Sequence, residues 1–252
     1  MKHFRFYPPL MLLVALLSCL PVSLGQGYIG QFDQALQSRD LVAQRKILEQ
    51  WQQADPNDRD LFVARYNYYL HLVADSVVTD EVQVQTLQDS ALAALDQGIA
   101  AHPRQLDLRF GKAFHYAMLH QWDAWADALV ATLDYSATIR HQWHYGYFNG
   151  DGEESLTVGL LDFMEDLFDH LESTDRPTAA DTLKVLSLRR VAKRMVQLFP
   201  SNVQALNYMA VSYAIFGDYD KALRYLQRAE AIDPSDPIVR QNIADLQAKI
   251  RQ

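Results

Sequence analysis

Residues 203–236 constrain the fold more than any other stretch of this chain. The stretch is 34 residues long and its apolar residues recur at helical spacing in two halves. A tight turn, Gly217-Asp218-Tyr219, separates the halves. The apolar positions are Leu206, Met209, Ala210 and Tyr213 before the turn and Ala222, Leu226 and Ala229 after it, followed by Pro234. The pattern predicts a hairpin of two short helices.

These residues and their 34-residue period resemble the tetratricopeptide repeat family. The resemblance implies an all-α fold, a right-handed α-solenoid built from stacked helical hairpins. It also implies a noncatalytic scaffold that binds a protein or peptide partner, and it implies no cofactor.

Four prolines extend the pattern beyond this stretch. Pro56, Pro103, Pro200 and Pro234 each follow a periodic, helix-like segment. We therefore predict degenerate hairpins over residues 28–58, 60–103, 106–134 and 155–200. Residues 237–250 carry one apolar stripe and an otherwise polar surface, which predicts a helix that caps the array. All of residues 26–252 are expected to form one domain.

Residues 135–154 interrupt the repeats. They carry Trp143, Tyr145, Tyr147 and Phe148, followed by the turn-forming run Asn149-Gly150-Asp151-Gly152. We predict an ordered aromatic insertion between hairpins.

The N-terminus has the order of a secretory signal peptide. Lys2 and Arg5 precede the apolar residues 10–20, and the small residues Ser23 and Gly25 follow. This pattern predicts cleavage before Gln26 and an exported protein, periplasmic or associated with an outer membrane, or secreted. A membrane anchor is the second interpretation, although Pro21 interrupts the apolar run. The third is lipidation at Cys19, because residues 16–19 resemble a bacterial lipobox.

The charge balance excludes some classes of partner. The formal net charge is -8. General nucleic-acid binders and proteins that bind anionic membranes need an electropositive surface, so neither class fits this composition.

No sequence motif supports catalysis. His141 and His144 form an HxxH pair, but a zinc site needs a third protein ligand and the HExxH motif of zinc proteases is missing. We expect no metal and no catalytic residue. The interpretation we favour is two loop histidines that hydrogen-bond within turns, and a hydrolase that uses them stays an alternative. Ser136 is a possible nucleophile for which spacing places no base.

The resemblance implies that the first helices of the hairpins line a concave binding surface. Their positions there carry no Lys or Arg, which favours an apolar or amide-bearing peptide over an acidic one. Phe110 and Phe114 are also open to a second interpretation, in which they pack against the insertion. Another function is a carbohydrate or small-ligand binder that stacks its ligand on Trp143, Tyr145 and Tyr147. The residues expected to bind a partner are Phe110, Phe114, Met118, Trp143, Tyr145, Tyr147, Gln204, Asn207 and Val211.

Overall fold

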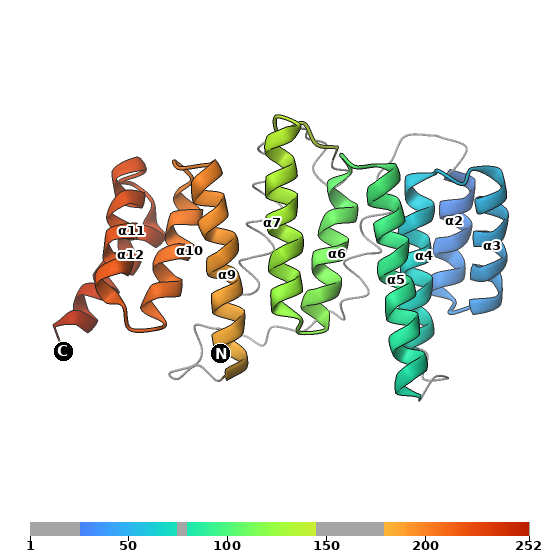
Figure 1. The fold of residues 1–252 in the computed structure, drawn as a ribbon, viewed down its shortest axis with the longest axis horizontal. Coiled ribbons are helices and arrows are strands. Elements are labelled where there is room, and N and C mark those ends of the chain that lie inside the picture. Colours follow the sequence, from blue (N-terminus) through green and yellow to red (C-terminus); the bar gives the residue numbers. More distant parts are fainter. Residues whose placement is uncertain (1–25, 75–79, 145–178, 252) are drawn as a thin grey trace. The chain divides into compact units, whose positions relative to one another are not determined.

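The computed structural model describes residues 26–74, 80–144 and 179–251, and these residues form ten helices and no strand (Figure 1). The prediction of an all-α fold built from helical hairpins is therefore confirmed. Among the helices described, none is long and apolar enough to cross a membrane. The predicted signal peptide, the lipobox with Cys19, and Tyr145 and Tyr147 lie outside the described residues.

The chain divides into two compact units. Unit 1 runs to His115 and includes Trp143 and His144, and unit 2 holds residues 116–142 and 179–251 of the described chain. The sequence predicted a single domain over residues 26–252, whereas the contacts within the chain gather in these two units.

Unit 1 consists of successive helices that pack on their neighbours. Helices α2 and α3 form one hairpin, α4 and α5 form the next, and α3 packs against α4. These pairs match the hairpins predicted over residues 28–58 and 60–103. The bounds are α2 Gln26–Gln37, α3 Leu41–Ala54, α4 Arg59–Ala74, α5 Glu81–Ala101 and α6 Leu106–Met118, of which α6 ends in unit 2.

Unit 2 contains the most regular hairpin, α10 with α11, and the predicted final helix α12. Helix α9 packs against both α7 and α10, and α11 packs against α12. One predicted boundary is wrong, because α7 continues to Thr138 and includes the first four residues assigned to the insertion. The first half of the predicted hairpin 155–200 lies outside the described residues. The bounds are α7 Trp122–Thr138, α9 Ala179–Leu198, α10 Val203–Ala214, α11 Tyr219–Ile232 and α12 Pro237–Ile250.

Each of the four prolines lies two residues beyond the end of a helix, as the sequence predicted. The helices end at Ala54, Ala101, Leu198 and Ile232. In each case the residue before the proline still donates its backbone N–H to the carbonyl four residues earlier, as Asp55 does to Trp51 at 2.9 Å. Proline has no N–H and disfavours helical geometry in the preceding residue, so the helix cannot continue.

Three hairpin turns share one backbone geometry although their sequences differ. In each, a residue with positive φ follows the first helix: Arg39 (55°), His120 (54°) or Gly217 (76°). The next residue donates its N–H to the carbonyl five positions earlier, as Asp218 does to Tyr213 at 3.1 Å. This is the Schellman arrangement that satisfies the last carbonyls of a helix. The turn of the clear repeat therefore recurs where no glycine marks it.

The buried residues explain why neighbouring helices stay together. In unit 1, Trp51 and Phe32 are fully buried in a cluster formed by α2, α3 and α4, and a second cluster joins α4, α5 and α6. In unit 2, Leu206, Leu226 and Leu246 join α10, α11 and α12. Leu48 and Trp51 of α3 are buried, as are Leu226 and Ala229 of α11.

Candidate functional site: a groove between α3 and α4

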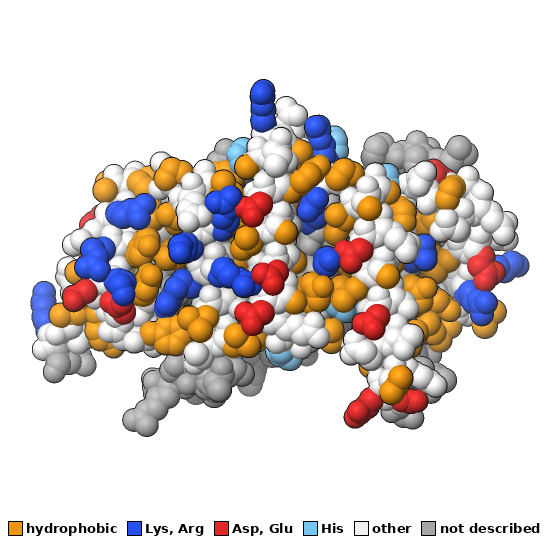
Figure 2. Space-filling model, viewed as in Figure 1, with side chains coloured by type: hydrophobic (Ala, Val, Ile, Leu, Met, Phe, Trp, Pro, Cys, Tyr) orange, Lys and Arg blue, Asp and Glu red, His pale blue; other side chains and the backbone are white. Residues whose placement is uncertain are grey.

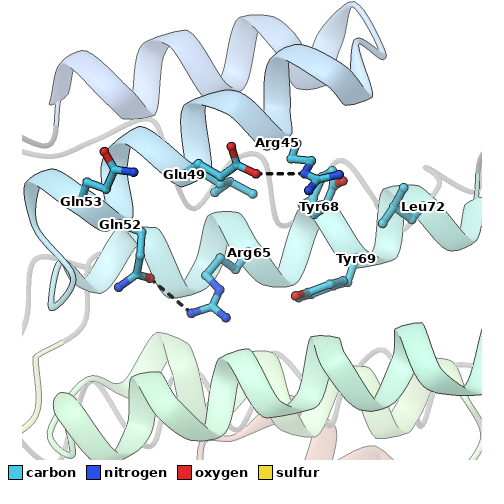
Figure 3. A pocket seen from close by; sticks show the side chains of 9 residues that line it. Arg45, Glu49, Gln52, Gln53, Arg65, Tyr68, Tyr69 and Leu72 are labelled. Carbon is cyan, nitrogen blue, oxygen red and sulfur yellow. Dashed lines mark hydrogen bonds and ion pairs between the residues drawn. The ribbon is translucent and has the colours of Figure 1, made fainter.

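An open groove of about 580 Å³ lies between α3 and α4 in unit 1 (Figure 3). Its size falls in the range of pockets that accept small ligands or short peptide segments. The residues that line it are Arg45, Leu48, Glu49, Gln52, Gln53, Arg65, Tyr68, Tyr69 and Leu72.

Helix α3 supplies one wall because its lining residues recur at intervals of three and four. Such residues share one helical face. Leu48 is buried and joins the core cluster of α2, α3 and α4, so it forms an apolar part of this wall. Arg45, Glu49, Gln52 and Gln53 are exposed. Asp40 fixes the start of the helix by accepting a hydrogen bond from the backbone N–H of Ala43 at 2.9 Å.

Helix α4 supplies the other wall, which is more aromatic. Tyr68 packs against the cluster of α2, α3 and α4, whereas Tyr69 packs against the cluster of α4, α5 and α6. Their ring centroids are 5.7 Å apart. Because both rings are anchored to the core yet half-exposed, they present preformed apolar surfaces beside polar groups.

Arg65 is the cation whose charge the groove leaves uncompensated. Its guanidinium donates to the side-chain oxygen of Gln52 at 3.4 Å and to that of Gln97, on α5, at 3.2 Å. Both acceptors are neutral amides. Among the described residues no carboxylate forms an ion pair with Arg65.

The second cation, Arg45, is partly compensated. Its Nε lies 3.0 Å from Oε1 of Glu49, one helical turn further along, and both side chains are well exposed. Exposed pairs of this kind contribute little stability and exchange partners readily. The hydrogen bond from Arg45 to Glu49 raises the pKa of this arginine, which stays charged.

The lining groups can donate and accept hydrogen bonds beside apolar side chains. Burial raises the pKa of Tyr68, so its phenol stays protonated near neutral pH and can donate a hydrogen bond. No lining residue is a histidine, cysteine, serine or threonine. In the part of the chain that the structure describes, no group of three or more potential metal ligands gathers anywhere. The groove therefore offers two guanidiniums, one carboxylate, two amides and two phenols beside the apolar side chains of Leu48 and Leu72.

Two aromatic residues expected to bind a partner, Phe110 and Phe114, are buried or half-buried. Phe110 is 8% exposed. Phe114 is half-buried and packs against the cluster that contains Phe62, Tyr66 and Leu108. These positions favour the packing interpretation, and the described residues that Phe114 packs against belong to the core of unit 1. Met118 is half-buried near the end of α6.

Trp143 is fully buried, so the exposed stacking surface expected for a carbohydrate binder is missing at this residue. The guanidinium of Arg109 lies over its indole ring, 5.4 Å from the centroid. The backbone of His144 pairs with that of Arg104 and Leu106, which holds this segment against the start of α6. Tyr145 and Tyr147 are outside the described residues.

In the clear repeat, the structure changes the role expected for Asn207. The residue is 4% exposed, and its side-chain oxygen accepts a hydrogen bond from Asn242 on α12 at 2.8 Å. The final helix thus occupies the position that the resemblance assigned to a partner. Gln204 and Val211 are half-buried, and their assignment stays a prediction.

Each histidine of the HxxH pair has contacts of its own. His141 Nδ1 lies 2.7 Å from the hydroxyl of Ser136, a Ser–His contact that spacing did not reveal. Ser136 is fully buried near the end of α7, so its hydroxyl is not presented to a substrate. The contact holds the turn after α7, in which His141 has a φ of 60°. His144 uses its backbone groups in the pairing with α6 described above.

Sequence reasoning missed the groove itself. A usable signal existed, because Arg45, Glu49 and Gln53 recur every four residues on α3 and the adjacent pair Tyr68-Tyr69 follows on α4. The signal was weak because exposed polar stripes occur on most surface helices. Its meaning depends on α3 and α4 packing side by side, which requires the tertiary structure.

Comparisons with known proteins support the family inferred for the C-terminal part. A family model described as tetratricopeptide repeat matches residues 203–246, which cover α10, α11 and most of α12. None of the curated proteins matches the chain.

Solved structures that resemble the chain include two of MamA and one of another repeat domain. "Crystal structure of MamA" is 14% identical, covers 85% of this chain and 97% of its own, and has a TM-score of 0.37. "MamA RS-1 ArsTM double mutant" is 12% identical, with coverage of 89% and 84% and a TM-score of 0.32. "Crystal Structure of P58(IPK) TPR Domain at 2.5 A" is 16% identical, with coverage of 90% and 66% and a TM-score of 0.33.

Proposed function

We propose that this chain is a noncatalytic scaffold that binds a peptide segment of a partner protein in the groove between α3 and α4. Residues 203–246, which match the tetratricopeptide repeat model, support a scaffold of this kind. Repeats of this kind bury their apolar faces against neighbouring repeats and use the remaining surfaces to bind partners. Among the described residues, the groove offers a hollow with converging polar groups.

The proposal rests mainly on Arg65. Its guanidinium is held by Gln52 and Gln97, from helices on either side, and is therefore oriented before a partner arrives. A preorganised guanidinium without a carboxylate partner binds an incoming carboxylate at low entropic cost.

The other lining groups specify a peptide rather than a compact anion. Tyr68, Tyr69 and Leu72 present apolar surface along α4, while Gln52 and Gln53 can pair with backbone amides of an extended segment. The expected ligand is a segment with an acidic side chain beside an apolar or aromatic one. This differs from the sequence-based expectation of an apolar or amide-bearing peptide on first-helix surfaces.

We place this binding outside the cytoplasm. The support is the pattern of residues 1–25, in which two basic residues, an apolar run and small residues follow in the order of a signal peptide. Detection of the mature chain beginning at Gln26 in an exported fraction would support this part of the proposal.

Site-specific photocrosslinking in the producing cell tests the groove. A photoreactive residue replaces Gln53, which lines the groove, or Gln31, an exposed glutamine on α2 that does not. We expect Gln53 to capture a peptide segment that Gln31 does not capture, and mass spectrometry then identifies the segment. Equal capture from both positions would contradict binding in the groove.

Titration of that synthetic segment against purified variants tests the role of Arg65. Arg65→Gln should weaken binding roughly ten- to hundredfold, because a charge-assisted hydrogen bond is lost. Arg104→Gln removes the same charge at an exposed position away from the groove and should leave the affinity unchanged. Unchanged affinity in Arg65→Gln, with its helical circular dichroism intact, would overturn the proposal.

A further inference from the structure

Unit 2 carries a cationic and aromatic surface that the proposed function does not use. Figure 2 shows Lys and Arg side chains gathered over α9–α12, in a chain whose net charge is -8. Part of this surface is built by contacts that join three helices. We call it the basic–aromatic surface, and it consists of Arg189, Tyr213, Phe216, Lys221, Arg224, Tyr225 and Arg228.

Cations and rings alternate across this surface. The guanidinium of Arg189 lies 4.1 Å from the ring centroid of Tyr213 and 5.0 Å from that of Phe216. Tyr213 stacks on Tyr225 with centroids 5.7 Å apart, and the guanidinium of Arg228 lies 5.5 Å from the Tyr225 centroid. Arg189 also donates from Nε to the hydroxyl of Ser212 at 3.0 Å and to its backbone carbonyl. These contacts fix the side chains from α9, α10 and α11 relative to one another.

Helix α11 extends this surface with a row of exposed cations. Lys221, Arg224 and Arg228 lie three and four residues apart, so they share one helical face. Lys221 is paired with Asp218, with the nitrogen and oxygen 2.5 Å apart. Arg224 and Arg228 form no ion pair with any carboxylate among the described residues. Of the acids of α11, Glu230 lies on another face of the helix, whereas Asp220 lies four residues before Arg224 and shares its face.

We infer that the basic–aromatic surface is a second docking site, which binds an acidic segment of a partner protein. Carboxylates of the segment pair with Arg224 and Arg228, and its apolar side chains contact Tyr225, Tyr213 and Phe216, which is 39% exposed. An arginine already stacked on a tyrosine loses little side-chain entropy when it binds a carboxylate.

A short protein segment fits this surface better than a nucleic acid or an anionic membrane. Charges are screened beyond about 8 Å at physiological ionic strength, so a short segment experiences mainly the local cations. A polyanion is much longer than this screening length, so it would also contact the remaining surface of the chain. The net charge of the chain is -8, so that surface would repel it. A bilayer or a duplex would therefore gain less from the four cations of this surface than it loses by repulsion from the remaining surface.

Fluorescence polarisation with a labelled synthetic peptide that repeats Glu-Glu-Tyr-Glu tests the inference. We expect saturable binding that weakens when salt is raised from about 50 to about 200 mM, and no binding of the matched Gln-Gln-Tyr-Gln peptide. The double variant Arg224→Gln/Arg228→Gln should weaken binding roughly three- to thirtyfold. Arg240→Gln/Lys249→Gln removes two exposed charges from α12 and should bind as the wild type does.

Several results would overturn the inference. One is equal weakening in the α11 and α12 double variants, which would indicate a general charge effect. Another is tighter binding of phosphatidylglycerol vesicles or a single-stranded oligonucleotide than of the peptide. If Arg65→Gln abolishes binding while the α11 variant does not, the acidic peptide enters the groove of unit 1. That result would support the proposed function and remove the second site.

Discussion

The side-chain amide of Asn242 on α12 donates to the side-chain oxygen of Asn207 on α10 at 2.8 Å. Asn207 is 4% exposed, and around it Leu206, Val239 and Leu246 belong to one buried cluster. The polar contact therefore lies beside an apolar interface and fixes how the final helix meets the last repeat. It also explains why this first-helix residue is closed to a partner.

Removal of the donor should destabilise unit 2. Asn242→Ala leaves the buried oxygen of Asn207 without its partner, and we expect the free energy of unfolding to fall by about 1–3 kcal/mol. Urea unfolding followed by circular dichroism measures the change. Gln241→Ala on the exposed side of α12 should change it by less than about 0.5 kcal/mol. Equal effects of the two substitutions would contradict a specific role for the amide pair.

A glycine in place of Arg39 should stabilise the turn between α2 and α3. Arg39 has a φ of 55°, a conformation that costs a side-chain-bearing residue about 1 kcal/mol and glycine almost nothing. Arg39→Gly is expected to raise the free energy of unfolding of unit 1 by about 0.5–1 kcal/mol. The control variant Arg39→Ala removes the arginine side chain but keeps a residue with a Cβ at this positive φ. A gain as large in Arg39→Ala would show that backbone relief is not the cause.

Substitution by alanine should affect the free energy of unfolding differently at two buried glycines, Gly98 and Gly111. A Cβ on Gly98 of α5 would lie 2.9 Å from Cβ of Phe62 on α4, so helices in close contact would have to separate. Gly98→Ala should lower the free energy of unfolding, since overpacking costs about 1–3 kcal/mol against a gain of about 1 kcal/mol in helix propensity.

Gly111 is the matched control for that substitution. A Cβ there would lie 3.5 Å from the nearest atom of Leu95, an ordinary contact. Gly111→Ala should therefore be neutral or stabilising by up to about 1 kcal/mol. Thermal unfolding of both variants decides the matter, and destabilisation of Gly111→Ala by as much as Gly98→Ala would contradict this account.

His115 should make stability depend on pH. Its side chain is fully buried against Tyr66, with ring centroids 5.7 Å apart. Burial lowers the pKa of His115 from 6.5 to about 4, and Asp89 opposes the shift. Between these values the unfolded chain binds a proton that the folded chain does not, so stability falls as pH decreases through this window. We expect a loss of roughly 1–3 kcal/mol between pH 7 and pH 4.

Urea unfolding across this pH range measures the dependence. His115→Gln should flatten the slope between the two pKa values, whereas His120→Gln, at an exposed position in a turn, should keep it. A slope that persists in His115→Gln would assign the effect to other groups.

Local sequence determined where the helices begin and end. Proline removes an N–H wherever it stands, so Pro56, Pro103, Pro200 and Pro234 fix four helix ends. Asp40, Asp80, Asp218 and Asp236 each accept a hydrogen bond from a backbone N–H in the first turn of the following helix, a second interaction confined to neighbouring residues. The repeat over residues 203–236 and the capping helix could be predicted because these signals agree there.

The tertiary structure decided which side chains from different segments contact each other. Asn207 pairs with Asn242, and Trp143 lies buried under Arg109. The groove likewise exists because α3 and α4 pack side by side and Gln97 on α5 orients Arg65. Helical periodicity assigns each residue to a face of its own helix. Which face meets which neighbour depends on contacts between segments distant in sequence, and these follow only from the packed chain.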